Sequence, residues 1–132
     1  MNTAKQTGPP SLLRLATAEG VSGAITIDVV GEIDIATLPA LDTQFGQALR
    51  RRELSQVVVD LSGVGFCGVA GLQAFVDLDQ RCNALGVDLE LKPSRIVRRA
   101  LDVTGLCSRF RLIGRWGANS QTTFAGRDRL SG

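Results

Sequence analysis

The residues best placed for chemistry in this chain lie where an apolar segment passes into a predicted helix. Residues 57–61 read Val-Val-Val-Asp-Leu, a run typical of a buried strand, and a glycine-punctuated turn follows them. The next residues open a helix. Because a helix N-terminus exposes backbone N–H groups at the positive end of the helix dipole, we expect its first residues on an exposed surface that suits contact with a partner. The predicted contact residues here are Gly68, Val69, Ala70, Gly71 and Leu72.

A second set of candidate contact residues follows the preceding predicted strand. Asp34 ends the segment Gly-Glu-Ile-Asp at 31–34, which closes that strand into a loop, and it lies on the same rim as Gly68. Two interpretations stay open for Asp34: it meets a partner, or it caps the next helix or simply faces water. Thr37 is the expected N-cap of that helix, because threonine is a preferred N-cap residue. The contact surface is therefore extended to Glu32, Asp34 and Thr37.

Three cysteines are the remaining candidates for reactive side chains. They are well separated and form no C-x-x-C pair, so neither a zinc site nor a disulfide framework is predicted. Cys82 is expected in the core, and Cys67 between a strand and a helix. Cys107 is near Arg109 in sequence, and an exposed thiol beside a guanidinium has a lowered pKa. Cys107, acting with Cys67, is therefore a candidate redox switch.

Composition excludes several classes of function. The chain of 132 residues contains no histidine and no tyrosine, which removes the commonest general base and the commonest metal ligand. No enzyme, no metal site and no cofactor is predicted. With a net charge of +2, neither nucleic-acid nor membrane binding is expected. No apolar stretch approaches the roughly 20 residues that span a bilayer, and the polar start is unlike a signal peptide, so we expect a cytoplasmic protein.

Strands and helices alternate along the predicted domain. Strands are expected over residues 12–18, 24–30, 57–61, 87–91 and 109–113. Helices are expected from Thr37 to the arginines 50–52, over 69–84, and from Ser94 to near Gly105. The apolar faces of these helices comprise Leu38, Leu41, Phe45 and Leu49; Leu72, Phe75, Leu78, Cys82 and Leu85; and Ile96, Val97, Ala100 and Leu101. This order predicts an α/β fold with a small mixed β-sheet flanked by α-helices.

The length fits one domain with terminal extensions. We expect a flexible N-terminal segment over residues 1–11, a domain over 12–113 and a mostly irregular tail over 114–132, which is rich in glycine, serine and threonine.

Three motifs in this order resemble those of the STAS domain family, specifically the bacterial anti-sigma factor antagonists. The first is Gly-Glu-Ile-Asp at 31–34 with Ala-Thr-Leu-Pro-Ala-Leu at 36–41. The second is Val-Val-Val-Asp-Leu-Ser-Gly-Val-Gly-Phe at 57–66, and the third is Leu-Asp-Val-Thr-Gly-Leu at 101–106. The resemblance covers residues 24–112 and implies the STAS fold. It also implies a histidine-kinase-like ATPase as partner, an anti-sigma factor whose capture releases a sigma factor.

The departures from this family concern its phosphorylation switch. The family usually has Asp-Ser-Ser-Gly-Leu where this chain has Gly-Val-Ala-Gly-Leu at 68–72, and the phosphorylated serine falls on Val69. Since valine carries no hydroxyl, we expect no phosphorylation there. Ser62, Ser94 and Thr104 are the fallback acceptors. Two alternative functions stay open: a redox-gated antagonist that uses Cys107, and a STAS subunit of a transporter or lipid-trafficking complex. A weak homodimer is a further candidate partner.

Overall fold

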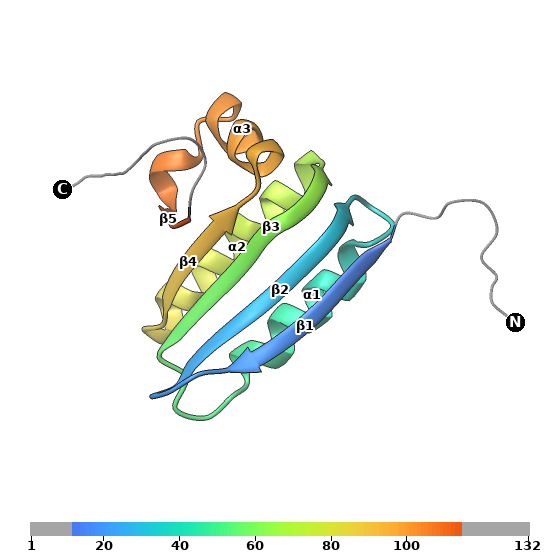
Figure 1. The fold of residues 1–132 in the computed structure, drawn as a ribbon. Helices are drawn as coiled ribbons and strands as arrows, with labels where there is room; N and C mark the ends of the chain where they lie inside the picture. The colour runs from blue at the N-terminus through green and yellow to red at the C-terminus, as the bar shows by residue number, and fades with distance from the viewer. Residues whose placement is uncertain (1–11, 115–132) are drawn as a thin grey trace, which may run out of the picture.

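The structure, a computed structural model, describes residues 12–114, and the predictions made for residues 1–11 and 115–132 lie outside this range. Within residues 12–114, five strands and three helices alternate after an initial hairpin (Figure 1). The strands are β1 (Leu13–Glu19), β2 (Ala24–Ile33), β3 (Gln56–Cys67), β4 (Asp88–Pro93) and β5 (Arg111–Leu112). The helices are α1 (Leu38–Leu49), α2 (Val69–Leu85) and α3 (Arg95–Val103), with a 3₁₀ turn over Cys107–Arg109. The predicted α/β fold with a mixed sheet is therefore confirmed.

The five strands form one sheet in the order β1-β2-β3-β4-β5. β1 is antiparallel to β2, and every later neighbour is parallel. Because the parallel strands advance in one direction and crossovers are right-handed, helices that connect them belong on the same face. α1 and α2 lie together behind the sheet in Figure 1, while α3 lies at its upper end.

The core lies between the sheet and these helices. Alternate residues of β2 and β3 point into it, and Ile27, Val29, Val57 and Val59 are fully buried. α1 contributes Leu41 and Phe45, and α2 contributes Phe75, Leu78 and Cys82. The opposite face of the sheet stays partly open, which is typical of a sheet covered by helices on one side.

Two strands extend beyond their predicted ends. β2 continues through residues 31–33, expected as a loop, and β3 continues through residues 62–67, expected as a turn. The two strands keep pairing across register shifts, and such bulges re-aim a strand without ending it. Gly31 makes this possible for β2: its φ of +124° favours glycine, and a Cβ there would collide with the carbonyl oxygen of Leu12.

Two apolar positions on the helices differ from the prediction. Leu85, at the end of α2, is 57% exposed, and Ile96, in the first turn of α3, is 48% exposed. Both residues fit the helical spacing, but each lies near a helix end, where the helix no longer has a neighbour on that side. Val97 and Leu101 are buried as predicted.

Candidate functional site

The candidate site is the rim where β2 and β3 end and where α1 and α2 begin. The backbone N–H of Gly68 donates to the carbonyl oxygen of Ile33 at 3.0 Å, which ties the start of α2 to the end of β2. The carboxyl ends of parallel strands are the usual binding edge of α/β sheets. The two sets of predicted contact residues therefore meet on one edge of the molecule.

A closed turn between β2 and α1 fixes the first half of this rim. The N–H of Asp34 donates to Thr37 Oγ1 at 3.0 Å, and the N–H of Thr37 donates to Asp34 Oδ1 at 3.0 Å. The Thr37 hydroxyl in turn donates to the carbonyl oxygen of Glu32 at 2.8 Å. These reciprocal bonds follow the geometry of a capping box. Asp34 thus has a structural role, whatever else it contacts.

Thr37 needs a correction as a contact residue. It is at the N-cap position of α1, but its side chain makes no capping bond to that helix. It is only 7% exposed, because its hydroxyl is used inside the turn, so it offers no surface to a partner. Glu32 is exposed on the rim.

The start of α2 forms the second half of the rim. Gly68 is the N-cap with an extended backbone and no side-chain cap, and Val69 is the first helical residue, 79% exposed. Ala70 is half-buried. Gly71 and Leu72 are buried against the core, so their predicted place on the contact surface is corrected: they pack the helix onto the sheet.

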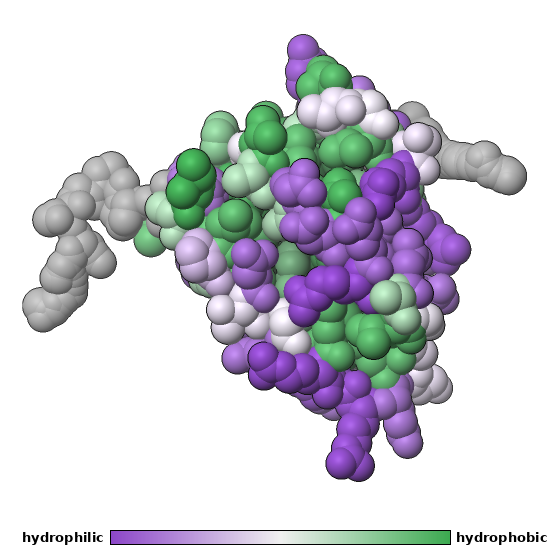
Figure 2. Space-filling view, turned by 180° about the vertical axis from the view of Figure 1, so that it is seen from behind, coloured by the Kyte–Doolittle hydropathy of each residue, from purple (hydrophilic) through white to green (hydrophobic). Residues whose placement is uncertain are grey.

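The sequence-based prediction missed two large apolar residues on this rim. Ile35 is 80% exposed in the turn after β2, and Phe66 is 50% exposed near the end of β3. The Phe66 ring lies over Gly68, with its Cε2 atom 3.7 Å from where a Cβ of residue 68 would be. We call Ile35, Phe66 and Val69 the rim patch. Figure 2 shows apolar side chains gathered over the end of the molecule where β2 ends and α1 begins.

Two signals in the sequence could have identified the rim patch. Ile35 follows an acid and precedes the helix, where a polar residue is ordinary. Phe66 directly precedes the half-buried Cys67 in a strand whose side chains alternate between faces. Both observations mark apolar side chains outside the core pattern.

The cysteines do not have the environment expected of a redox switch. Arg109 Nε pairs with Asp79 Oδ2 at 3.2 Å instead of contacting Cys107. The Cys107 thiol donates to Asp102 Oδ1 at 2.7 Å. Burial and this hydrogen bond raise the pKa of Cys107 to about 12, although the nearby Arg98 partly offsets them. Burial also raises the pKa of Cys67 to about 11. Both thiols stay protonated at neutral pH, so the lowered pKa expected for Cys107 is wrong.

The three fallback hydroxyls are all engaged within the chain. Ser62 Oγ bonds Asp60 Oδ1 at 2.6 Å, and Thr104 Oγ1 donates to the carbonyl oxygen of Ala100 at 2.7 Å. Ser94 Oγ accepts from the N–H of Val97 at 3.2 Å and so caps α3. None of these three hydroxyls lies at the start of α2.

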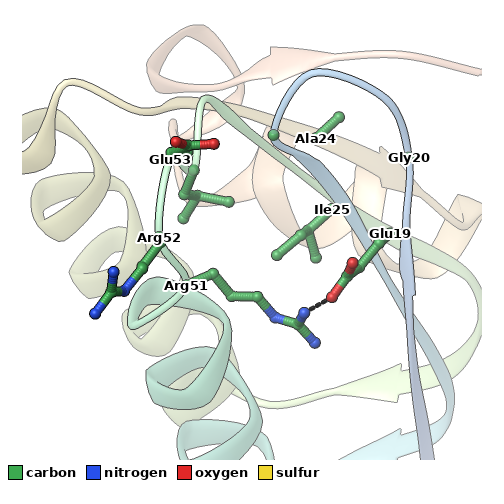
Figure 3. A pocket seen from close by; sticks show the side chains of 9 residues that line it. Glu19, Gly20, Ala24, Ile25, Arg51, Arg52 and Glu53 are labelled. Atoms are coloured by element: carbon green, nitrogen blue, oxygen red, sulfur yellow. Dashed lines mark ion pairs between the residues drawn. The ribbon is translucent and has the colours of Figure 1, made fainter.

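A pocket of about 300 Å³ lies at the other end of the sheet, where β1 ends and β2 begins (Figure 3). Arg51 points toward Glu19 and pairs with it, so two of the charges that line the pocket neutralise each other. None of the predicted contact residues lines it. Within residues 12–114 no group of three or more candidate ligands could hold a metal ion, and no helix is long and apolar enough to cross a membrane.

Comparison with known proteins gives a consistent result. The family model described as the STAS domain matches residues 16–119. An anti-sigma factor antagonist from Mycobacterium paratuberculosis is 28% identical, with a TM-score of 0.67 over 80% of this chain and 89% of that chain.

Two structures of SpoIIAA share the fold at lower identity. The anti-sigma factor antagonist SpoIIAA in its unphosphorylated form is 15% identical, with a TM-score of 0.65 over 76% of this chain and 89% of that chain. The phosphorylated form of SpoIIAA, the Bacillus cell fate determinant, is 14% identical, with a TM-score of 0.60 over 76% of this chain and 92% of that chain. No curated protein matches the chain in sequence.

Proposed function

The chain belongs to the STAS domain family, and from that membership we propose that it binds an anti-sigma factor, as an antagonist that phosphorylation at the start of α2 cannot release. The observation that carries the proposal is Val69. It is the first residue of α2, it is 79% exposed, and it has no hydroxyl. The role is one of binding rather than catalysis, and we place it in the cytoplasm.

The rim patch supports a binding role. Full burial of one large apolar side chain contributes about 1.5–3 kcal/mol, and a few such anchors dominate most protein interfaces. Ile35, Phe66 and Val69 present three anchors on one rim. The Asp34–Thr37 bonds and the Gly68–Ile33 bond hold the backbone that carries them, so little ordering is needed on binding.

The charge of the rim supports an unregulated contact. A phosphoserine adds a charge of about −1.5 to −2 at neutral pH. At position 69 such a charge would be introduced beside an apolar patch, on the rim where Glu32, the register partner of Phe66, is also exposed. Because Val69 accepts no phosphate, the rim keeps one charge state, and we expect the affinity for a partner to be independent of ATP.

The test is binding to the histidine-kinase-like anti-sigma factors encoded in the same genome, measured before and after incubation with ATP and magnesium. We expect one of them to bind and to stay bound after ATP. Phe66→Ala should weaken that binding by at least about tenfold. Truncation of an interface anchor of this size costs about 1.4–3 kcal/mol of binding free energy, and about 1.4 kcal/mol corresponds to a tenfold change in affinity. Leu85→Ala is the matched control, since Leu85 is similarly exposed but lies at the far end of α2.

Two results would contradict the proposal. Loss of binding after ATP would mean that another residue accepts the phosphate. Failure to bind any such protein would favour the other STAS role considered above, a subunit of a transporter or lipid-trafficking complex.

A further inference from the structure

Among residues 12–114, β1 is the longer of the two edge strands of the sheet and has no strand on its outer side. The strand order puts β1 and β5 at the two edges, and Figure 1 shows β1 as the outermost strand. β5 spans two residues, whereas β1 spans seven. Edge strands are normally protected by shortness, charged side chains, proline or a bulge. β1 carries two charged residues, Arg14 and Glu19, and both lie toward its ends. β5 is short, but β1 has neither proline nor glycine, and its register with β2 is unbroken.

We propose that β1 pairs antiparallel with β1 of a second copy of this chain, which joins the two sheets across a two-fold axis. This inference is independent of the proposed function.

The backbone of β1 is oriented for such pairing. The carbonyl oxygen of Leu12 accepts from the N–H of Glu32, and the N–H of Gly20 donates to the carbonyl oxygen of Ala24. Leu12 and Gly20 flank β1, so the even-numbered residues of this strand are the ones whose backbone groups face β2. Hydrogen-bonded positions alternate along an antiparallel strand. The N–H and C=O groups of the odd-numbered residues 13, 15, 17 and 19 therefore point outward, where no strand among residues 12–114 pairs with them.

One register satisfies these groups and uses the whole strand. Two antiparallel copies centred on Ala16 place Leu13 opposite Glu19 and Leu15 opposite Thr17, so that outward-facing residues pair with each other. A shift by one residue would pair outward-facing with inward-facing backbone groups. A shift by two leaves the end of each strand unpaired.

The side chains are compatible with this register. Arg14 lies opposite Ala18 of the second copy, and Glu19 lies opposite Leu13, so no like charges meet. Ala16 meets its own counterpart on the axis, where two small side chains allow close approach. The antiparallel arrangement puts the two rim patches at opposite ends of the joined sheet.

The expected dimer is weak and reversible, because one strand edge is a small interface. Sedimentation of the full chain from about 1 μM to about 1 mM should show a shift from monomer to dimer. Ala16→Lys should weaken the association at least about tenfold, because it puts two ammonium groups on the axis. Ala18→Glu should strengthen it, because the new carboxylate faces Arg14 of the other copy. Both positions are exposed, so the fold should tolerate either change.

Cross-linking tests the register itself. Ala16→Cys should form a disulfide between two copies under mild oxidation, since directly opposite residues in a non-hydrogen-bonded pair have their Cα atoms about 4.5 Å apart. Ala18→Cys is the matched control, because it faces Arg14 and should not cross-link. The unaltered chain gives the background from its own three cysteines. A monomer at every concentration, or equal cross-linking of the two variants, would overturn the proposal.

Discussion

Gly71 in α2 packs directly against Ile33 at the end of β2. A Cβ at position 71 would lie 2.5 Å from Ile33 Cγ2 and 2.8 Å from Cys67 Sγ, closer than real Cβ atoms approach their neighbours. The close approach brings the first turn of α2 onto the sheet beside the Gly68–Ile33 hydrogen bond. The position of Val69 on the rim therefore depends on a glycine two residues further along the helix.

Gly71→Ala should destabilise the protein by about 1–3 kcal/mol, the usual cost of overpacking a core. Alanine favours helix over glycine by about 1 kcal/mol, so propensity alone predicts the opposite sign. Gly46→Ala is the control: Gly46 is also helical, but a Cβ there would only meet Arg81 at 3.8 Å, and that variant should be neutral or stabilised. Urea unfolding of both variants measures the difference, and equal effects would contradict the packing argument.

Thr37→Val should cost about 1–3 kcal/mol of unfolding free energy. The substitution keeps the shape of the side chain but removes the hydroxyl that bonds the backbone of Glu32 and Asp34, and it leaves those groups unsatisfied in a nearly buried turn. Thr43→Val, at an exposed position of α1, should change stability by less than about 0.5 kcal/mol. Thermal or urea unfolding compares the two, and a neutral Thr37→Val would remove the structural role that we assign to the turn.

The stability of the protein should fall in alkaline solution. The pKa values of Cys67 and Cys82 are raised to about 11 and that of Cys107 to about 12, from 9.0, chiefly by burial. Above pH 9 the unfolded chain loses thiol protons that the folded chain retains, so the free energy of unfolding decreases as the pH rises toward 11. Below pH 9 the thiols contribute no pH dependence.

The composition makes this alkaline effect measurable. The chain has no tyrosine, and Lys5 and Lys92 are its lysines, so few other groups titrate in the same window. Urea unfolding at about pH 8 and about pH 10 should show the decrease, and Cys107→Ser should reduce it. An unchanged unfolding free energy over this range would mean that the thiols are not protected as described.

The sequence predicted the strands and helices more accurately than it predicted which side chains lie on the surface, and individual residues show why. Period-two alternation in β2 and the helical spacing of Leu72, Phe75 and Leu78 report burial directly, so the fold class and α2 were accurate. The extension of β2 and β3 was missed, because residues 31 and 62–65 combine glycine and serine, which also form turns. Only strand pairing across a bulge distinguishes the two structures.

The candidate site was predicted as a location but not as a set of contacts. The structure brings Asp34 and Gly68 to one rim, as the sequence predicted, and their contact with a partner stays a prediction. Composition could not show that Thr37 turns inward or that Ile35 and Phe66 stay outside. The orientation of Thr37 depends on hydrogen bonds between residues three apart in a turn. The exposure of Phe66 depends on the face of the sheet to which its side chain points after the bulge. The turn leaves no periodic signal in the sequence, whereas the alternation of side chains in β3 is a signal that could have pointed to Phe66.

Val69→Ser should restore a phosphate acceptor at the start of α2. The residue is 79% exposed and makes the first turn of a helix with no acidic side chain in it, so the substitution should change stability by less than about 0.5 kcal/mol. With a cognate anti-sigma factor and ATP, this variant should take up phosphate at position 69. It should then lose binding, because a phosphate group is costly to bury at the apolar contact that Val69 makes in the unaltered chain. Val69→Ala removes the isopropyl group without adding a hydroxyl, so it should bind more weakly than the unaltered chain but lose no further binding after ATP. Mass spectrometry of the peptide around α2 distinguishes the outcomes. Phosphate on the unaltered chain in the same reaction would mean that Val69 does not account for the missing switch.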